Sequence, residues 1–397
     1  MKQLIISIIF TTILFADVIV VDQSGSGDYT TISDAVSNAS SGDTIEVHSG
    51  LYIEDFDVSN FTSLTINGAG SSSTTIYTSN YAIESNNSTL TLSGLKIWST
   101  SGTALDAREG GNLTVTNCLI ISDGFYVVRI NYLDTATFSD CTMEGNLDDN
   151  MFVTGTNLNV INSTISSGTK GIYANNSSAL NIINSTIYNS NFAGIHTSDG
   201  STADITNSII RNTGVEYSGG GVYVSSGSGA VTITNTLIFK ANHYAVRAYE
   251  NVDIQNSIIY DAPVGLYRSE GENGYGDILS AFNCFYLVTD PYGSDEGYNY
   301  PTGFDDLINT DPEFVDIDAD NNLLTDLTLQ STSPCIDAGN YSPVYNDLDG
   351  SRNDMGIYGG PYSWVATISA TVTDLQISPS TVEQGQTITI QATGTVE

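Results

Sequence analysis

The chain is poor in basic residues and in charged residues generally. Only ten Lys and Arg stand against 45 Asp and Glu, which gives a formal net charge of −35. A surface of that sign repels phosphate backbones, so nucleic-acid binding is disfavoured. Charged residues make up only 14% of the sequence, whereas Gly, Ser, Thr and Asn are abundant throughout, as turn-rich all-β chains require. Long helices are therefore not expected.

Cysteines and long apolar runs are also few. None of the four cysteines belongs to a CxxC pair, so a zinc site or a thioredoxin-like motif has no support. The one marked apolar run, Leu4 to Phe15, follows Lys2 and ends at Ala16, as in a secretory signal peptide. We therefore expect residues 1–16 to be a signal peptide, with a secreted, extracellular or cell-surface product and no membrane span after its removal.

Instead of helices, the middle of the chain contains a repeat. Segments such as LNVINSTI, from Leu158, and LNIINSTI, from Leu180, share a polar position whose spacing ranges from 21 residues (Asn235 to Asn256) to 28 (Asn207 to Asn235). Periods of this size indicate a solenoid. An Asn at each bend can adopt a left-handed backbone conformation, and stacked amides can hydrogen-bond along the column. We therefore predict a structural ladder of Asn117, Asp140, Asn162, Asn184, Asn207, Asn235, Asn256 and Asn283.

Apolar residues occur at fixed offsets from this position. Those four and two residues before it, as in Leu158 and Val160, alternate with polar residues and would line one face of a short strand. The same offsets place Leu279 and Ala281 inside in the last coil. Residues three after it, such as Ile165, form a third inward column. A single coil cannot bury its own apolar face, but stacked coils can.

The pattern resembles the right-handed parallel β-helix of the pectate-lyase-like superfamily over about residues 44–290, with residues 51–300 as the helix body. Cys118 and Cys141 would stack one coil apart, either as a disulfide or as two free buried thiols. The fold implied is all-β, a solenoid with short caps.

The ends of the solenoid carry their own signals. Residues 17–50 are predicted to form an N-terminal cap with one short amphipathic helix within Tyr29–Ala39, because an open coil end exposes core and strand edge. Residues 301–362, with SPCIDAG and DLDGSRNDMGIYG, resemble the choice-of-anchor Q region of bacterial surface proteins and are predicted to form a C-terminal cap. Residues 363–397 alternate like the first strands of an immunoglobulin-like module, too short to complete one.

A second recurring strand, seen in GIYANN, GIHTSD and GVYVSS, offers candidate binding residues. Its outward column can stack on sugar rings through aromatic faces and hydrogen-bond to hydroxyls or carboxylates. Tyrosine is also a common exposed strand residue without any function. The candidates for glycan binding are Asp106, Tyr126, Tyr173, His196, Tyr223, Arg247 and Tyr267.

Catalysis and metal binding have weaker support. Hydrolysis needs two facing carboxylates, and the nearby Asp199, Glu216, Glu250 and Glu270 form no evident pair. Asp316, Asp318 and Asp320 alternate like the start of a calcium loop but lack its glycine and final Glu. No cofactor is required, although Ca²⁺ is possible. Two functions stay open: a monomeric, non-catalytic module that binds a polysaccharide or cell-surface glycan, adheres or acts as a spacer, and a polysaccharide lyase or glycoside hydrolase.

Overall fold

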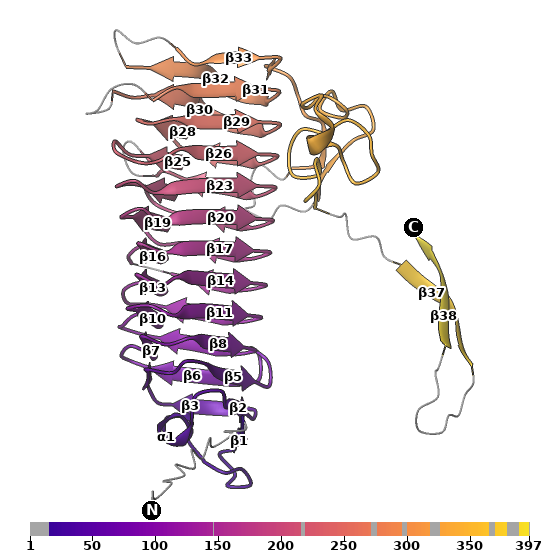
Figure 1. The fold of residues 1–397 in the computed structure, drawn as a ribbon. Helices are drawn as coiled ribbons and strands as arrows, with labels where there is room; N and C mark the ends of the chain where they lie inside the picture. Colours follow the sequence, from indigo (N-terminus) through magenta and orange to yellow (C-terminus); the bar gives the residue numbers. More distant parts are fainter. Residues whose placement is uncertain are drawn as a thin grey trace, which may run out of the picture.

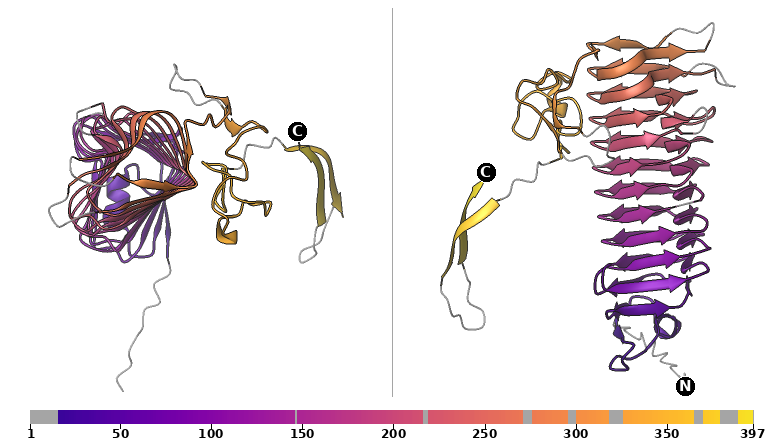
Figure 2. Two further views of the ribbon diagram at one scale, coloured as in Figure 1. Left: turned by 90° about the horizontal axis from the view of Figure 1, so that it is seen from above. Right: turned by 180° about the vertical axis from the view of Figure 1, so that it is seen from behind.

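The computed structural model describes residues 16–145, 147–215, 219–270, 276–295, 300–317, 326–364, 370–378 and 389–396. Most of these residues form a rod of stacked coils with three short parallel strands per coil, so that three sheets run along the rod (Figure 1). Seen from above, the coils superimpose into one closed outline (Figure 2). The β-solenoid that the repeat predicted is confirmed.

The first sheet, here sheet 1, begins earlier in the chain than the repeat indicated, at Val18. Most of its strands bury every second residue, as in β11, where Leu113 and Val115 face the core, whereas the last strand, β33, is exposed throughout. Its thirteen strands are β1 (Val18–Val21), β2 (Thr44–Val47), β5 (Leu64–Gly68), β8 (Leu90–Ser93), β11 (Asn112–Thr116), β14 (Thr135–Ser139), β17 (Asn157–Ile161), β20 (Ala179–Ile183), β23 (Thr202–Thr206), β26 (Val231–Thr234), β29 (Val252–Gln255), β31 (Ile278–Ala281) and β33 (Thr302–Phe304).

Sheet 2 follows the bend after each sheet 1 strand. It contains the third inward column, which includes Ile120, Ile165 and Ile210, all fully buried. Its strands are β3 (Gly50–Ile53), β6 (Thr74–Thr78), β9 (Lys96–Ser99), β12 (Leu119–Ser122), β15 (Thr142–Glu144), β18 (Thr164–Ser166), β21 (Thr186–Tyr188), β24 (Ile209–Thr213), β27 (Leu237–Ala241), the first parts of β30 (Ile258–Arg268) and β32 (Cys284–Ser294), and β34 (Leu307–Ile308).

Sheet 3 closes each coil and is joined to sheet 2 where the long strands β30 and β32 bend from one into the other. One continuous apolar core fills the space between the three sheets. The strands of sheet 3 are β4 (Phe56–Ser59), β7 (Ile83–Asn86), β10 (Leu105–Arg108), β13 (Val128–Asn131), β16 (Met151–Thr154), β19 (Lys170–Asn175), β22 (Ala193–Thr197), β25 (Gly220–Val224), β28 (Tyr244–Ala248) and the second parts of β30 and β32.

The N-terminal end of the rod is covered by the predicted helix, α1 (Ile32–Asn38), which lies below β3 and over the core (Figures 1 and 2). Thr31 caps its first turn by accepting a hydrogen bond from the backbone N–H of Asp34. The carboxylate of Glu54 accepts hydrogen bonds from the backbone N–H groups of Ile32 and Ser33, both 2.9 Å long. Donors that a helix start leaves open are thus paired.

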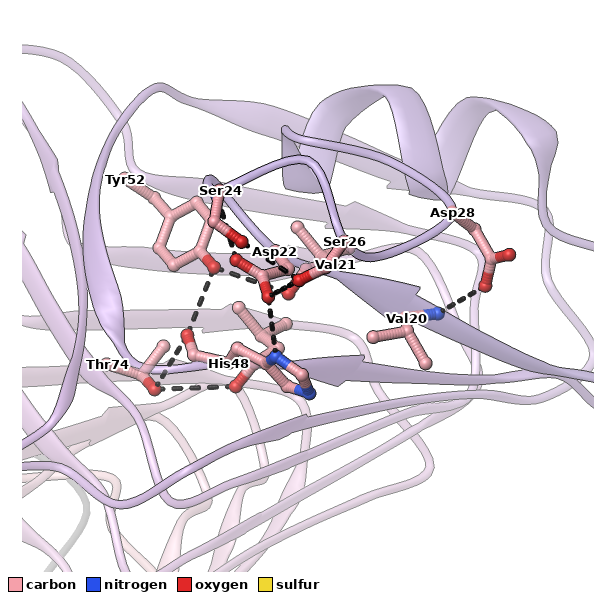
Figure 3. A network of polar contacts seen from close by, with 10 residues as sticks. Val20, Val21, Asp22, Ser24, Ser26, Asp28, His48, Tyr52 and Thr74 are labelled. Carbon is pink, nitrogen blue, oxygen red and sulfur yellow. Dashed lines mark hydrogen bonds and ion pairs between the residues drawn. The ribbon is translucent and has the colours of Figure 1, made fainter.

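The segment before α1 is held by the carboxylate of Asp22 (Figure 3). It accepts hydrogen bonds from the hydroxyl of Ser26, at 2.6 Å, and the backbone N–H of Ser24, at 2.8 Å, and lies 3.1 Å from Nδ1 of His48. These bonds, that from Ser26 first, hold the pKa of Asp22 well below its usual value. Tyr52 beside it donates to the carbonyl of His48 at 3.0 Å. These contacts tie the turn at residues 22–26 to His48, which lies just before β3 in the first coil.

The bend between sheets 1 and 2 repeats one left-handed backbone conformation. In eight successive coils the residue after the sheet 1 strand has a φ between 47° and 56°, and the strand registers place these residues one above another. Asn and Asp tolerate this conformation better than most residues. No hydrogen bond joins neighbouring side chains of this column within the described residues. The bend column consists of Asn117, Asp140, Asn162, Asn184, Asn207, Asn235, Asn256 and Phe282.

The last coil differs from the predicted register by one residue. Leu279, predicted to face inward, is 62% exposed, whereas Ile278 beside it is buried. The bend position belongs to Phe282, so the assignment of Asn283 to the ladder was wrong. Asn283 is buried one residue later, and its Nδ2 donates to the carbonyl of Ile254 at 2.9 Å.

The segment after the last coil lies along the side of the rod instead of stacking on its end (Figures 1 and 2). It contains β35 (Phe314–Asp316), β36 (Asp326–Leu329) and the short 3₁₀ helix η1 (Pro343–Tyr345). We call residues 311–364, as far as they are described, the side segment. The C-terminal cap predicted for residues 301–362 therefore does not close the end of the rod but covers part of its side.

The side segment is held by the amides of the bend column. Nδ2 of Asn207 donates to the carbonyls of Ile357 and Gly359, at 2.9 and 2.7 Å. Nδ2 of Asn235 lies 2.8 to 3.1 Å from three acceptors in the side segment, among them the carbonyl of Asp354. These contacts join residues more than a hundred positions apart in the chain.

A second apolar core lies between the side segment and the outer face of sheet 2. It includes Phe239 and Tyr260 from the rod and Phe314, Cys335 and Ile357 from the side segment. Outward positions of β27 and β30 are therefore buried.

Beyond the side segment, β37 (Ala370–Ser378) and β38 (Thr389–Val396) pair as an antiparallel hairpin. That residues 363–397 form the first strands of an immunoglobulin-like module stays a prediction.

Candidate functional site

Sheet 3 carries the outward column that the repeat predicted, with two changes. The registers stack Asp106, Tyr173, His196, Tyr223, Arg247 and Tyr267 in one column, together with Arg129 and Phe152. The placement of Tyr126 in this column was wrong, because β13 starts only at Val128. Tyr126 lies just before that strand and reaches the same surface, where its ring stacks on Phe152 with centroids 5.1 Å apart.

Glycines at the start of the strands bring the coils of sheet 3 close together. A Cβ on Gly194 would lie 2.6 Å from Cγ2 of Ile210 and 2.8 Å from the carbonyl oxygen of Gly221. Any larger residue there would push the coils apart. The glycine of the GIY, GIH and GVY repeats therefore sets the close spacing at which the outward rings meet.

The rings of successive coils contact one another along sheet 3. Phe152 and Tyr173 have centroids 5.5 Å apart, Tyr173 and His196 4.7 Å, and His196 and Tyr223 4.9 Å. All are half-buried. Such pairs stabilise each other beyond their buried area and keep the rings rigid. We call this surface the aromatic stripe; it comprises Tyr126, Phe152, Tyr173, Phe192, His196, Tyr223, Tyr244, Tyr249 and Tyr267.

At the N-terminal end of the stripe, Asp106 is buried between two guanidinium groups. Nε of Arg108 and Nε of Arg129 donate to its Oδ1 at 2.9 and 3.0 Å, and each arginine makes a second bond to Oδ2. Burial raises the pKa of Asp106, but these bonds outweigh it and leave the pKa below its ordinary value. Asp106 is thus an ionised anchor that orients two arginines.

Lys170 and His196 form the centre of the stripe. The Lys170 ammonium is 2.9 Å from Oδ1 of Asp149 and lies 4.5 Å from the centroid of the Tyr173 ring. Burial, reinforced by this ammonium, lowers the pKa of His196 to about 3, so its ring is neutral at physiological pH. Its Nε2 is 2.7 Å from the hydroxyl of Ser225.

Arg247 occupies the C-terminal part of the stripe. Its guanidinium is 5.2 Å from the centroids of Tyr244 and Tyr249 and 5.7 Å from that of Tyr267, within the range of cation–π attraction. It also donates to the hydroxyl of Ser269 at 2.9 Å. Tyrosines thus surround and orient this cation.

A polar hollow of about 630 Å³ lies beside the stripe at the bend between sheets 2 and 3. Asn191, which lines it, precedes Phe192 of the stripe, and Nδ2 of Asn212 donates to Oδ1 of Asn189 at 3.2 Å. The lining is Asn189, Asn191, Asn212, Val215, Lys240, Ala241, Asn242, Asp261 and Pro263.

Several residues of this surface were missed by the sequence reasoning, namely Phe152, Lys170, Phe192, Tyr244 and Tyr249. The coil period could have found Phe152, which lies one coil before Tyr173. Phe192 and Tyr249 sit outside the strands, where repeats give no register.

The carboxylates named as possible catalytic groups are not brought together as a facing pair by any contact in the described part of the chain. Glu250 accepts a hydrogen bond from the backbone N–H of Gly227 at 2.8 Å, and Glu216 lies outside the described residues. Among the residues described, no group of three or more His, Cys, Asp or Glu is placed to hold a metal ion. Asp316 ends β35, but Asp318 and Asp320 lie outside the described residues, so the calcium loop stays a prediction.

Three parallel sheets closed into stacked coils give this chain the fold of a right-handed parallel β-helix. A family model described as "Right handed beta helix region" matches residues 149–275. Curated protein sequences give no match. The described residues contain no helix with the length and apolarity that crossing a bilayer requires.

Solved structures with the same fold have low sequence identity to this chain. The pectate lyase Pel9A is 14% identical to this chain. The match covers 86% of this chain and 95% of the lyase, with a TM-score of 0.55. The catalytic unit of a GH87 α-1,3-glucanase from Streptomyces thermodiastaticus is 15% identical over 70% of this chain and 64% of its own, with a TM-score of 0.51. ORF18 of Geobacillus virus E2 is 12% identical over 75% and 62%, with a TM-score of 0.50.

Proposed function

We propose that the protein is an exported β-helix that binds an extended polysaccharide along the aromatic stripe without cleaving it, as a secreted or cell-surface adhesive or spacer module. The observation that carries this proposal is the continuity of the stripe, whose rigid rings follow one another at about the spacing of the coils. A ligand with a repeating sugar unit suits such a periodic surface.

The charge on this face supports the same proposal. Four of the ten Lys and Arg of this very acidic chain, Arg108, Arg129, Lys170 and Arg247, contact the stripe or its column. Their donors can reach sugar hydroxyls and carboxylates. Two proteins with this fold, a pectate lyase and an α-1,3-glucanase, act on polysaccharides, which makes polysaccharides the first ligands to test.

Binding is favoured over catalysis by the state of the ionisable groups on the stripe. Two arginines hold the pKa of Asp106 below its usual value. Asp149 is bound by the Lys170 ammonium, but burial outweighs this contact and raises its pKa. His196 has a pKa of about 3 and is therefore a poor proton donor near neutral pH. Asp106 and His196 in these states can hold a ligand in place but are not poised for proton transfer.

The test is gel retention of the full chain on immobilised polygalacturonate and on an insoluble α-glucan. Replacing Tyr173 and Tyr223 together by Ala should weaken retention about tenfold or more, since each stacking contact contributes about 1 kcal/mol. Tyr77→Ala, which removes a ring from sheet 2, is the matched control and should bind like the wild type. Equal retention of the double variant and the wild type would contradict the proposal. Release of reducing ends or unsaturated sugars, with or without Ca²⁺, would favour the enzyme alternative.

A further inference from the structure

Two of the four cysteines meet where the side segment packs on the rod. Cys284 begins β32 and its side chain points out of sheet 2, while Cys335 belongs to the SPCIDAG turn of the side segment. Both are fully buried in the second apolar core. Sγ of Cys284 donates to the carbonyl of Thr310 at 3.2 Å. Interaction with the Cys335 thiol in the same buried cluster is the main cause of the raised pKa of Cys284, so the two side chains are neighbours.

The other two cysteines are arranged differently, although they also lie one coil apart. Sγ of Cys118 donates to the carbonyl of Thr116 at 3.3 Å, and Sγ of Cys141 to that of Ser139 at 3.2 Å. Each thiol is thus bonded to its own strand. Directly opposed residues of parallel strands also have Cβ atoms farther apart than the roughly 3.8 Å typical of a disulfide.

We propose that Cys284 and Cys335 form a disulfide that fastens the side segment to the rod, while Cys118 and Cys141 stay reduced. The bond would close a loop from residue 284 to residue 335, which contains β33 to β36. Closing a loop of this length restricts the unfolded chain and so stabilises the packed state. This inference does not depend on the proposed function.

The oxidation is a thiol–disulfide exchange with a small or protein disulfide. One cysteine thiolate attacks the oxidant, forming a mixed disulfide and releasing one thiol; the second cysteine thiolate then attacks the mixed disulfide and releases the other. The two cysteines lose two electrons and two protons, and the oxidant becomes two thiols. Hydrogen bonding with Cys335 and burial raise the pKa of Cys284 far above its usual range. The exchange should therefore occur during folding, before the side segment closes over both sulfurs.

The experiment is disulfide mapping of the full chain. The protein is unfolded in guanidinium chloride with dithiothreitol, refolded with oxidised glutathione, alkylated under denaturing conditions and digested without reductant. Mass spectrometry should find one cross-linked peptide pair containing Cys284 and Cys335, with Cys118 and Cys141 alkylated. Four alkylated cysteines, or a different predominant pair, would overturn the proposal.

Two variants provide matched controls. Cys118→Ser should keep the cross-link, whereas Cys335→Ser should lose it and leave Cys284 alkylated. The oxidised wild type should melt about 5 °C above its reduced form, and the melting temperature of Cys335→Ser should not respond to reductant. Equal melting of the oxidised and reduced wild type would show that the bond does not fasten the side segment. If Cys335→Ser fails to fold, the maps of the wild type and Cys118→Ser still decide the pairing.

Discussion

The lower and upper halves of the bend column use the same residue for different purposes. Asn117 and Asn162 are exposed, and their side chains make no bond to another segment within the described structure. Asn207 and Asn235 have nearly the same φ but are fully buried and hold the side segment. The comparison separates a backbone role, common to every coil, from a docking role that only the upper coils have.

The largest effect is expected where both roles are lost. Asn235→Ala places Ala in the left-handed region and removes the donor to three buried acceptors, which should cost about 3 kcal/mol of unfolding free energy. Unfolding in guanidinium chloride measures the total loss of unfolding free energy. Hydrogen exchange of residues 326–364 shows whether this loss falls in the side segment. Asn235→Gly relaxes the backbone but still lacks the amide, so about 2 kcal/mol of the loss should remain. Full recovery with Gly would mean that the docking bonds contribute nothing.

A smaller effect is expected in the lower half. Asn162→Ala should cost about 1 kcal/mol, because only the left-handed conformation is penalised. Asn162→Gly should lie within about 0.5 kcal/mol of the wild type by the same unfolding measurement. A loss at Asn162→Gly as large as at Asn235→Gly would remove the distinction between the two halves.

The smallest effect concerns pH and the side segment alone. Burial, assisted by the nearby Asp347, Asp337 and Asp349, raises the pKa of Asp354 from 3.8 to about 6. A raised pKa means that the folded state binds the proton more tightly, so this contribution is full below pH 4 and is lost as the pH rises through 6. The side segment should therefore be protected better from hydrogen exchange at pH 5 than at pH 7.5.

Asp354→Asn tests this dependence directly. Its Oδ1 can still accept the hydrogen bond from the backbone N–H of Asp337. The variant should stabilise the side segment at pH 7.5 by less than about 1 kcal/mol, since solvent screens a half-exposed group, and change nothing near pH 4. Unaltered pH dependence in this variant would assign the effect to another group.

Much of the rod could be predicted because each coil is determined by residues close together in the sequence. Two-residue alternation around a recurring Asn identified sheet 1, the bend and the first half of sheet 2, coil after coil. The predicted register was wrong in the last coil, where the residue type at the bend changes. Phe282 occupies the bend there, because its ring packs against Phe304 and Tyr341. The prediction had assigned the bend to Asn283, the next residue along the chain. Tyr126 was misplaced for a similar reason, since residues 124–129, GFYVVR, look like the other repeats but their strand, β13, starts only at Val128.

The docking of the side segment could not be predicted from the repeat. Asn162 and Asn235 occur in equivalent motifs, and nothing local reveals that one of them will meet a chain segment more than a hundred residues away. Likewise, the column of candidate residues followed from periodicity, whereas Phe192 and Tyr249 reached it from loops. Contacts between distant segments depend on tertiary packing, which short patterns do not encode.

The place where Trp364 is attached has a mechanical consequence. Its indole N–H donates to the carbonyl of Asn207, several coils before the end of the rod and at the corner opposite sheet 3. Trp364 is therefore fixed at the side of the rod, and a force applied at this residue would pull across the coils instead of peeling them apart from the tip. A long polymer lying on sheet 3 would be on the opposite side of the rod from this attachment point.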